Sequence, residues 1–234
     1  MNKADFTVIL GTAHLQTTPG KRSPDGTLRE TVYSREIVSR VKADLEADGY
    51  NVVVDYEPLI PNTDIKAASS KAEQNRELAY RVNFVNAICK KVGAKKCLYM
   101  SIHVNAAGSG KNWMSAGGWC CYTSEGKTRA DVLSAFLYDA AKLNFKAYEK
   151  IMGQGKKKGI YDKYQKPYRT DYSDDDADME ANFYVLRNTN CAACLSENFF
   201  QDNRSDVAFL LSEEGKDAIV RTHVEAIKNY VATL

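Results

Sequence analysis

The stretch CLYMSIHVNA, residues 97–106, alternates regularly between two kinds of side chain. One set is apolar and comprises Leu98, Met100, Ile102 and Val104. The other set is more polar and comprises Tyr99, Ser101, His103 and Asn105. A period of two predicts a β-strand with one apolar face, and it places His103 on the polar face near the end of that strand. Because the chain contains only 3 histidines, the position of this one is informative.

Before and after this strand in the sequence, apolar strand patterns alternate with amphipathic helix patterns. Further strands are predicted at residues 6–10, 51–56, 117–124, 182–188 and 191–197. Helices are predicted at residues 31–48, 71–92, 127–143, 204–211 and 214–233. This alternation predicts an α/β fold: a single three-layer domain over residues 1–234, with a mostly parallel twisted sheet of about six strands and helices on both faces.

Residues 144–181 interrupt this alternation of strand and helix patterns. They contain a lysine run (Lys156–Lys158), an aromatic and basic stretch (YDKYQKPYR) and an acidic cluster (DYSDDDAD). We interpret them as an insertion at the surface, whose lysines or Arg169 can pair with carboxylates of a substrate. The alternative is a solvated loop with no further role.

Composition excludes several classes of function. The chain has 234 residues, 44% of them hydrophobic, and a net charge of +2, so nothing favours a nucleic acid or an anionic membrane as partner. No apolar run approaches the roughly 18 residues of a membrane span. The opening sequence MNKADFTVILGTAH lacks the pattern of a signal peptide. We expect that export is not encoded here or that its segment is missing from this chain.

Six cysteines are present, and most are expected to be reduced and buried. They are Cys89, Cys97, Cys120, Cys121, Cys191 and Cys194. A structural zinc site formed by Cys120, Cys121, Cys191 and Cys194 is an alternative. Its geometry is poor, because residues 191 and 194 point to opposite faces of a strand.

Polar residues follow the ends of three predicted strands. His14 follows the first strand, His103 ends the strand quoted above, and Glu197 ends CAACLSE. Because sites in open α/β sheets form beyond the carboxyl ends of strands, we expect these side chains to meet at one edge. Two imidazoles and a carboxylate are a common catalytic zinc set. Glu30 and Glu197 are both candidates for the third ligand, and the other carboxylate would then handle protons.

Each residue also has a simpler interpretation. His14 can be an ordinary loop residue, His103 a hydrogen-bonded residue at a sheet edge, and Glu30 a first-turn glutamate favoured by the helix dipole. Glu197 can be a surface strand end, although the apolar residues around it make an unpartnered carboxylate costly. Their predicted meeting at one edge weakens all of these interpretations together. His223 lies within the last predicted helix and is interpreted as structural.

With these residues in place, the chain resembles the zinc-dependent N-acetylmuramoyl-L-alanine amidases of the type-3 family, from about residue 6 to residue 231. The segment Ser101–Ala106 matches the family's Ser-Ile-His-x-Asn-Ala strand. Arg81 and Asn86 have the family's Arg-to-Asn spacing. LRETVYSREIV resembles the segment that carries the family's glutamate ligand, Glu30 here. ACLSENFFQDN resembles the segment that carries its catalytic glutamate, Glu197 here.

The resemblance implies that His14, Glu30 and His103 hold one zinc ion and that Glu197 is the general base and acid. It implies an enzyme that hydrolyses the amide between N-acetylmuramic acid and the L-alanine of the stem peptide. The partner would be peptidoglycan or a muropeptide at the bacterial cell wall. Two departures affect the shape of the site: Leu15-Gln16 follows the first histidine where the family usually has two glycines, and the 144–181 insertion is long.

Three rival functions remain open. A zinc peptidase or other amidohydrolase acting on a different peptide would usually place its histidine and glutamate ligands three residues apart, whereas His14 and Glu30 are far apart. A non-catalytic wall-binding protein on the same fold predicts a broken ligand set, and no ligand is replaced here. A redox or structural protein built on the cysteines would be identified by thiol titration with zinc analysis.

Overall fold

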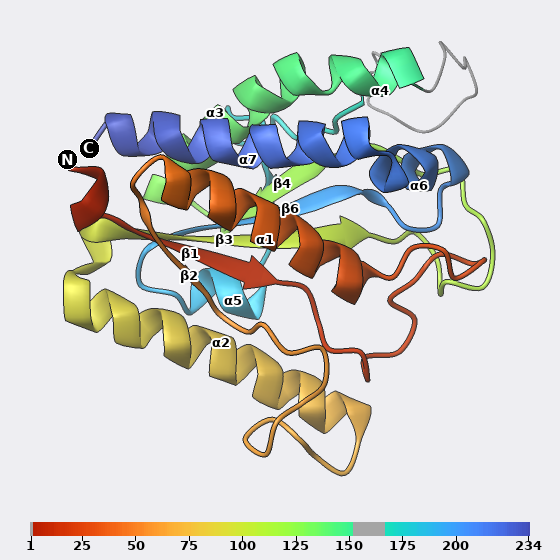
Figure 1. Cartoon of the computed structure of the whole chain (residues 1–234), viewed down its shortest axis with the longest axis horizontal. Helices are drawn as coiled ribbons and strands as arrows, with labels where there is room; N and C mark the ends of the chain where they lie inside the picture. Colours follow the sequence, from red (N-terminus) through yellow and green to blue (C-terminus); the bar gives the residue numbers. More distant parts are fainter. Residues whose placement is uncertain (1, 152–166) are drawn as a thin grey trace.

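A six-stranded sheet forms the centre of the computed structural model, which describes residues 2–151 and 167–234 (Figure 1). The strand order is β2-β1-β3-β6-β4-β5, and every neighbouring pair is parallel except β4 with β6. The strands are β1 (Thr7–Thr12), β2 (Asn51–Val54), β3 (Cys97–Asn105), β4 (Cys120–Thr123), β5 (Met179–Glu180) and β6 (Ala192–Phe200). The prediction of a mostly parallel sheet of about six strands is confirmed.

Helices cover both faces of this sheet (Figure 1). They are α1 (Glu30–Ala47), α2 (Ser70–Val92), α3 (Arg129–Asn144), α4 (Lys146–Ile151), α5 (Tyr184–Arg187), α6 (Arg204–Leu211) and α7 (Glu213–Ala232), with two short 3-10 helices, η1 (Lys3–Asp5) and η2 (Ala94–Lys96). Helices α1, α3 and α7 pack together on one face, and α2 with α5 lies on the other. Within the described ranges, no helix is both long and apolar enough to cross a membrane.

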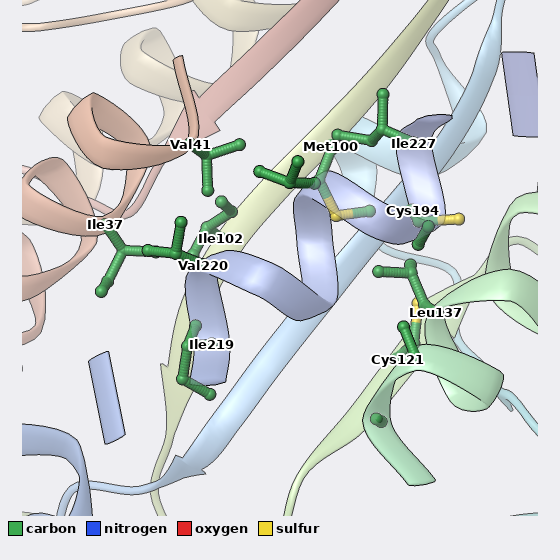
Figure 2. Packing of buried hydrophobic residues seen from close by; sticks show 14 of the residues in the cluster. Ile37, Val41, Met100, Ile102, Cys121, Leu137, Cys194, Ile219, Val220 and Ile227 are labelled. Carbon is green, nitrogen blue, oxygen red and sulfur yellow. The ribbon is translucent and has the colours of Figure 1, made fainter. Parts of the chain in front are cut away.

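The main core lies between the sheet and α1, α3 and α7 (Figure 2). Met100 and Ile102, from the apolar face of β3, pack there with Ile37, Val41 and Val220. The opposite face of β3 contributes Tyr99 to a second cluster with α2. The alternating pattern of residues 97–106 therefore directs the apolar side chains of β3 toward the main core and places His103 on the opposite face of the strand.

The prediction of a strand at residues 182–188 is wrong. This segment contains α5, and the sixth strand is β5 instead. Two adjacent residues, Val185 and Leu186, are both buried in the second cluster, which the alternating geometry of a one-sided strand does not allow. The backbone N–H and the side-chain amide of Asn188 both donate to the carbonyl of Tyr184, which closes the helical turn.

The segment interpreted as an insertion is partly integrated into the fold. Tyr168 forms a bridge with Trp119, and the N–H of Arg169 donates to the carbonyl of Trp119 at 2.7 Å. The side chain of Arg169 lies over the ring of Phe200, 5.4 Å from its centroid. The lysine run Lys156–Lys158 lies outside the described residues.

A buried ion network supports the end of β1, where the chain turns toward His14. Arg81 is 3% exposed, and its guanidinium pairs with Asp55 and with Glu77. Asp55 also accepts hydrogen bonds from the Tyr99 hydroxyl at 2.8 Å and from the N–H of Thr12 at 3.1 Å. The positive charge of Arg81 therefore offsets the negative charges of two buried carboxylates. One of them, Asp55, binds the N–H of Thr12, the last residue of β1.

Replacing Arg81 with Leu is expected to lower the free energy of unfolding by about 3–5 kcal/mol, because it leaves buried carboxylates without their cation. Urea unfolding followed by circular dichroism measures this change. The control is Lys71→Leu, an exposed position on the same helix, which should stay within about 0.5 kcal/mol. Equal stabilities of the two variants would contradict the role given to Arg81.

Candidate metal centre and catalytic site

Three side chains from separate parts of the sequence converge beyond the carboxyl ends of β1 and β3. The Oε1 atom of Glu30 lies 3.5 Å from Nε2 of His14 and 3.1 Å from Nδ1 of His103. All three donor atoms lie within 4.8 Å of one another. Sequence reasoning predicted that His14 and His103 share this edge, and the structure brings Glu30 to the same point.

His14 is held by its backbone. It has a φ of 45°, which is uncommon for a residue other than glycine. The guanidinium of Arg35 donates to the carbonyls of Ala13 and His14, each at 2.9 Å. The Ser34 hydroxyl accepts from the N–H of Ala13 at 2.8 Å and donates to the carbonyl of Ile102 at 2.6 Å. These bonds from α1 tie the end of β1 to the end of β3.

Glu30 is the first residue of α1, and it is 1% exposed. Its Oε1 accepts a hydrogen bond from the N–H of Val104 at 3.2 Å. Arg22 and Arg29 form an antiparallel bridge, and the Glu30 N–H donates to the Lys21 carbonyl, so the chain folds back on itself before α1. This turn places Nζ of Lys21 3.8 Å from Oε2 of Glu30.

Lys21 was missed by sequence reasoning. The signal that could have identified its neighbourhood is Ser-Pro-Asp-Gly-Thr at residues 23–27, a composition typical of a tight turn. There Asp25 accepts hydrogen bonds from the hydroxyls of Ser23 and Thr27. The turn brings the residues before and after it together, and this places a cation beside Glu30.

The three donors fit a zinc ion in number, type and spacing. Zinc–nitrogen and zinc–oxygen bonds of about 2.0–2.2 Å place tetrahedral ligand atoms roughly 3.4 Å apart. The two distances from Glu30 to the histidines, 3.1 and 3.5 Å, bracket that value. Oε2 of Glu30 is buried without a hydrogen-bond partner among the described residues, as expected beside a cation. Nε2 of His103 lies 3.1 Å from the Ser101 hydroxyl, which can orient the ring.

The charge states of Glu30 and His103 also suit a cation. Burial opposes ionisation of Glu30, but the charge of His14 and the hydrogen bond with His103 outweigh it, so the pKa of Glu30 lies well below its usual value. Burial lowers the pKa of His103 despite its contact with Glu30. An ionised carboxylate and a neutral imidazole are the forms that bind metal ions.

Glu197 lies beside this group on β6. The parallel register of β3 and β6 pairs His103 with Glu197, so both residues occupy the same face of the sheet. Oε2 of Glu197 is buried and has no hydrogen-bond partner among the described residues. Burial, with the nearby charge of Glu30, raises the pKa of Glu197 well above its usual value. A raised pKa brings a carboxyl group closer to the range in which it can both accept and return a proton during a reaction.

The remaining candidate residues lie elsewhere. His223 is fully buried in α7, where its Nε2 lies 2.8 Å from the Ser196 hydroxyl, in agreement with a structural role. All six cysteines are buried free thiols. Cys191 and Cys194 belong to the cores on opposite faces of the sheet, so the four-cysteine zinc site with Cys120 and Cys121 is excluded.

Comparison with known proteins identifies one family. The model of the family described as N-acetylmuramoyl-L-alanine amidase matches residues 8–229. A curated relative, the endolysin of Bacillus phage SPP1, is 28% identical over 138 residues, which is 59% of this chain and 41% of the endolysin. The aligned part of this chain thus spans less than half the length of that relative.

Solved structures share the fold. An N-acetylmuramoyl-L-alanine amidase from Clostridium difficile 630 is 19% identical, with a TM-score of 0.70 and 97% of each chain covered. The CwlD amidase from Clostridioides difficile, solved in complex with the GerS lipoprotein, is 16% identical, with a TM-score of 0.69 and coverage of 98% of this chain and 100% of that one. At these identities the likeness establishes the architecture.

Proposed function

The chain belongs to the N-acetylmuramoyl-L-alanine amidase family, and we propose that it is a zinc-dependent peptidoglycan hydrolase. It cleaves the amide between the lactyl group of N-acetylmuramic acid and the L-alanine of the stem peptide. The observation that carries the proposal is the convergence of His14, Glu30 and His103 at one sheet edge, with Glu197 beside them on the neighbouring strand. Its substrate is peptidoglycan or a muropeptide, and it acts at the cell wall.

His14, Glu30 and His103 hold the zinc ion in this proposal. When bound, zinc supplies a Lewis acid that polarises the scissile carbonyl and lowers the pKa of a nearby water. The hydrogen bonds from Arg35 to the carbonyl of His14 and from Ser34 to the carbonyl of Ile102 fix the end of β1 relative to β3, and they thereby position His14 relative to His103. Lys21 contributes a positive charge beside the buried carboxylate of Glu30.

Glu197 performs the proton transfers. As general base it accepts a proton from the attacking water, which forms the new bond to the carbonyl carbon. As general acid it then delivers that proton to the nitrogen of L-alanine, which leaves as an amine while the lactyl group becomes a carboxylate. Its buried oxygen has no hydrogen-bond partner among the residues that the structure describes, which suits a group that receives and releases the proton.

Analysis of the digestion products tests this reaction. Purified sacculi and a defined muropeptide are incubated with the zinc-loaded protein, and the products are identified by mass spectrometry. The proposal predicts intact stem peptides with a free L-alanine amine and glycan chains with free lactyl carboxyls. Cleavage within the stem peptide would identify a zinc peptidase instead. Binding to sacculi without cleavage would identify a wall-binding protein.

Arg169 is the described residue of the 144–181 segment that we expect to bind substrate. It lies at the carboxyl end of β6 over Phe200, on the edge of the sheet that carries Glu197. Stem peptides carry carboxylates, and an arginine can pair with them. Arg169→Gln is expected to raise KM for muropeptides by about tenfold or more, the effect of one hydrogen bond to a charged group, with little change in kcat.

Steady-state kinetics on a defined muropeptide measure this effect. The control is Arg187→Gln on α5, a helix beside the amino end of β6 and remote from the proposed site. It should leave KM unchanged. An unchanged KM for Arg169→Gln, on both muropeptides and whole sacculi, would remove Arg169 from substrate binding.

A further inference from the structure

A second group of side chains that could hold a metal ion lies at the opposite end of the parallel strands from the proposed catalytic site. Cys89 is in the last turn of α2, Cys97 begins β3, and Cys191 directly precedes β6. Their sulfur atoms lie within 4.8 Å of one another, and those of Cys89 and Cys97 are 3.4 Å apart. His103 lies six positions after Cys97 in β3, a distance of about 20 Å along a strand. The two groups are therefore independent.

The spacing of the three sulfur atoms suits one metal ion. Zinc–sulfur bonds of about 2.3 Å place tetrahedral thiolates roughly 3.8 Å apart. The observed separations extend from 3.4 Å to no more than 4.8 Å, so small side-chain rotations reach that geometry. A set made only of sulfur selects soft cations such as Zn²⁺ over Mg²⁺ or Ca²⁺. Among the residues that the structure describes, no other three cysteines form such a group.

A turn after α2 and the side chain of Asn86 bring these three cysteines together. Gly93, with a φ of 96°, ends α2, and η2 then returns the chain so that Cys97 lies against Cys89. The side chain of Asn86 accepts from the N–H of Asn190 at 2.9 Å and donates to the carbonyl of Asn188 at 2.8 Å. Asn86 thus fixes the segment that carries Cys191 against α2.

The surroundings of the group provide access and a balancing charge. Cys89 and Cys191 each line a surface depression, and they are 4% and 8% exposed. The guanidinium of Arg129 donates to the carbonyl of Ala94 at 3.4 Å, next to the thiols. Three thiolates and a divalent cation carry a net charge of about −1, which this arginine offsets. Three small residues that served only to fill the core would not need three neighbouring sulfur atoms or the nearby guanidinium of Arg129.

We propose that Cys89, Cys97 and Cys191 bind one thiophilic divalent cation of the Zn²⁺ class, separate from the catalytic ion. On binding, the three thiols release their protons to solvent and form metal–sulfur bonds, and water from a depression would complete the coordination. The ion joins the end of α2 to the starts of β3 and β6. It therefore stabilises the side of the fold opposite the active site.

Cobalt substitution tests the proposal directly. Co²⁺ is added to the reduced, metal-free full chain without oxygen, and the near-ultraviolet spectrum is recorded for sulfur-to-cobalt charge transfer. Nitrogen and oxygen ligands at His14, Glu30 and His103 do not give this band. We expect the band in the unmodified chain and in His103→Ala, its loss in Cys89→Ser, and its retention in Cys121→Ser, a buried cysteine outside the group. Absence of the band, or its persistence in Cys89→Ser, would overturn the proposal.

Zinc stoichiometry gives a second measurement that separates the two sites. If both assignments hold, the unmodified chain binds about two zinc ions, of which His103→Ala and Cys89→Ser each remove a different one. If His103→Ala lowers the zinc content but Cys89→Ser does not, the cysteine site is overturned and the proposed function stands. If Cys89→Ser lowers the zinc content but His103→Ala does not, the cysteine site is supported and the proposed catalytic zinc site is contradicted.

Discussion

Replacing Glu197 with Gln is expected to lower kcat by on the order of 10²-fold or more while leaving zinc bound. The amide keeps the size and much of the polarity of the carboxyl group, but it cannot accept a proton from water. Removal of a positioned acid–base group typically costs this much. The position of Glu197 next to His103 in the β3–β6 register, outside the group of three donors, predicts loss of turnover without loss of metal.

Turnover of a muropeptide and zinc content are measured on the same preparation. The matched control is Glu180→Gln, because Glu180 is exposed on the edge strand β5 and accepts a hydrogen bond from the N–H of Gly126. This control should retain nearly full activity. Near-normal turnover of the Glu197 variant would reassign the base to another group.

Replacing His103 with Ala is expected to remove the catalytic zinc ion and with it the amidase activity. Loss of one of three protein ligands should weaken zinc binding by more than about 100-fold, the upper range for changes to residues that only orient a ligand. The fold should persist, because His103 lies on the polar face of β3 and the main core packs on the other face. Circular dichroism checks the fold, and elemental analysis measures the metal.

The control for this variant is His223→Gln, which also removes a histidine. His223 is buried between Ser196 and the carbonyl of Ile219, so its replacement should reduce stability but preserve the catalytic zinc. A His103→Ala protein that keeps a zinc ion at His14 and Glu30 and retains activity would contradict the ligand assignment.

The sheet and the approach of the two histidines could be predicted from the sequence because both follow from strand patterns. Alternation in residues 97–106 gives the faces of β3, and the rule that sites lie beyond parallel strand ends brings His14 and His103 together. The choice between Glu30 and Glu197 as ligand rested on the family resemblance. The structure places Glu30 between the two histidines, and the catalytic roles remain proposals.

Other features depend on contacts that local patterns do not contain. Residues 182–188 have strand-like composition, but Val185 and Leu186 are both buried in the second cluster against α2, and this long-range packing favours α5. Lys21 reaches Glu30 only because the chain folds back before α1. In each case the deciding interaction joins residues that a periodicity analysis treats separately.

The cysteines illustrate the same limit. The spacing of Cys191 and Cys194 suggests a metal-binding pair, yet a strand directs them to opposite faces. The sulfur atoms close to Cys191 come from Cys89 and Cys97, about a hundred residues earlier, because β3 and β6 are neighbours in the sheet. Strand order is set by long-range packing, so this group could not be recognised from spacing along the chain.

Anomalous scattering at the zinc absorption edge tests the catalytic site most directly. Crystals of the zinc-loaded chain are measured above and below the edge, and the difference map locates each zinc ion independently of the coordinates. We predict a peak within bonding distance of His14, Glu30 and His103, on the side of the sheet edge that faces Glu197. A map from zinc-saturated crystals with no peak beside these three residues would contradict the account, whether or not a peak occurs at the cysteines.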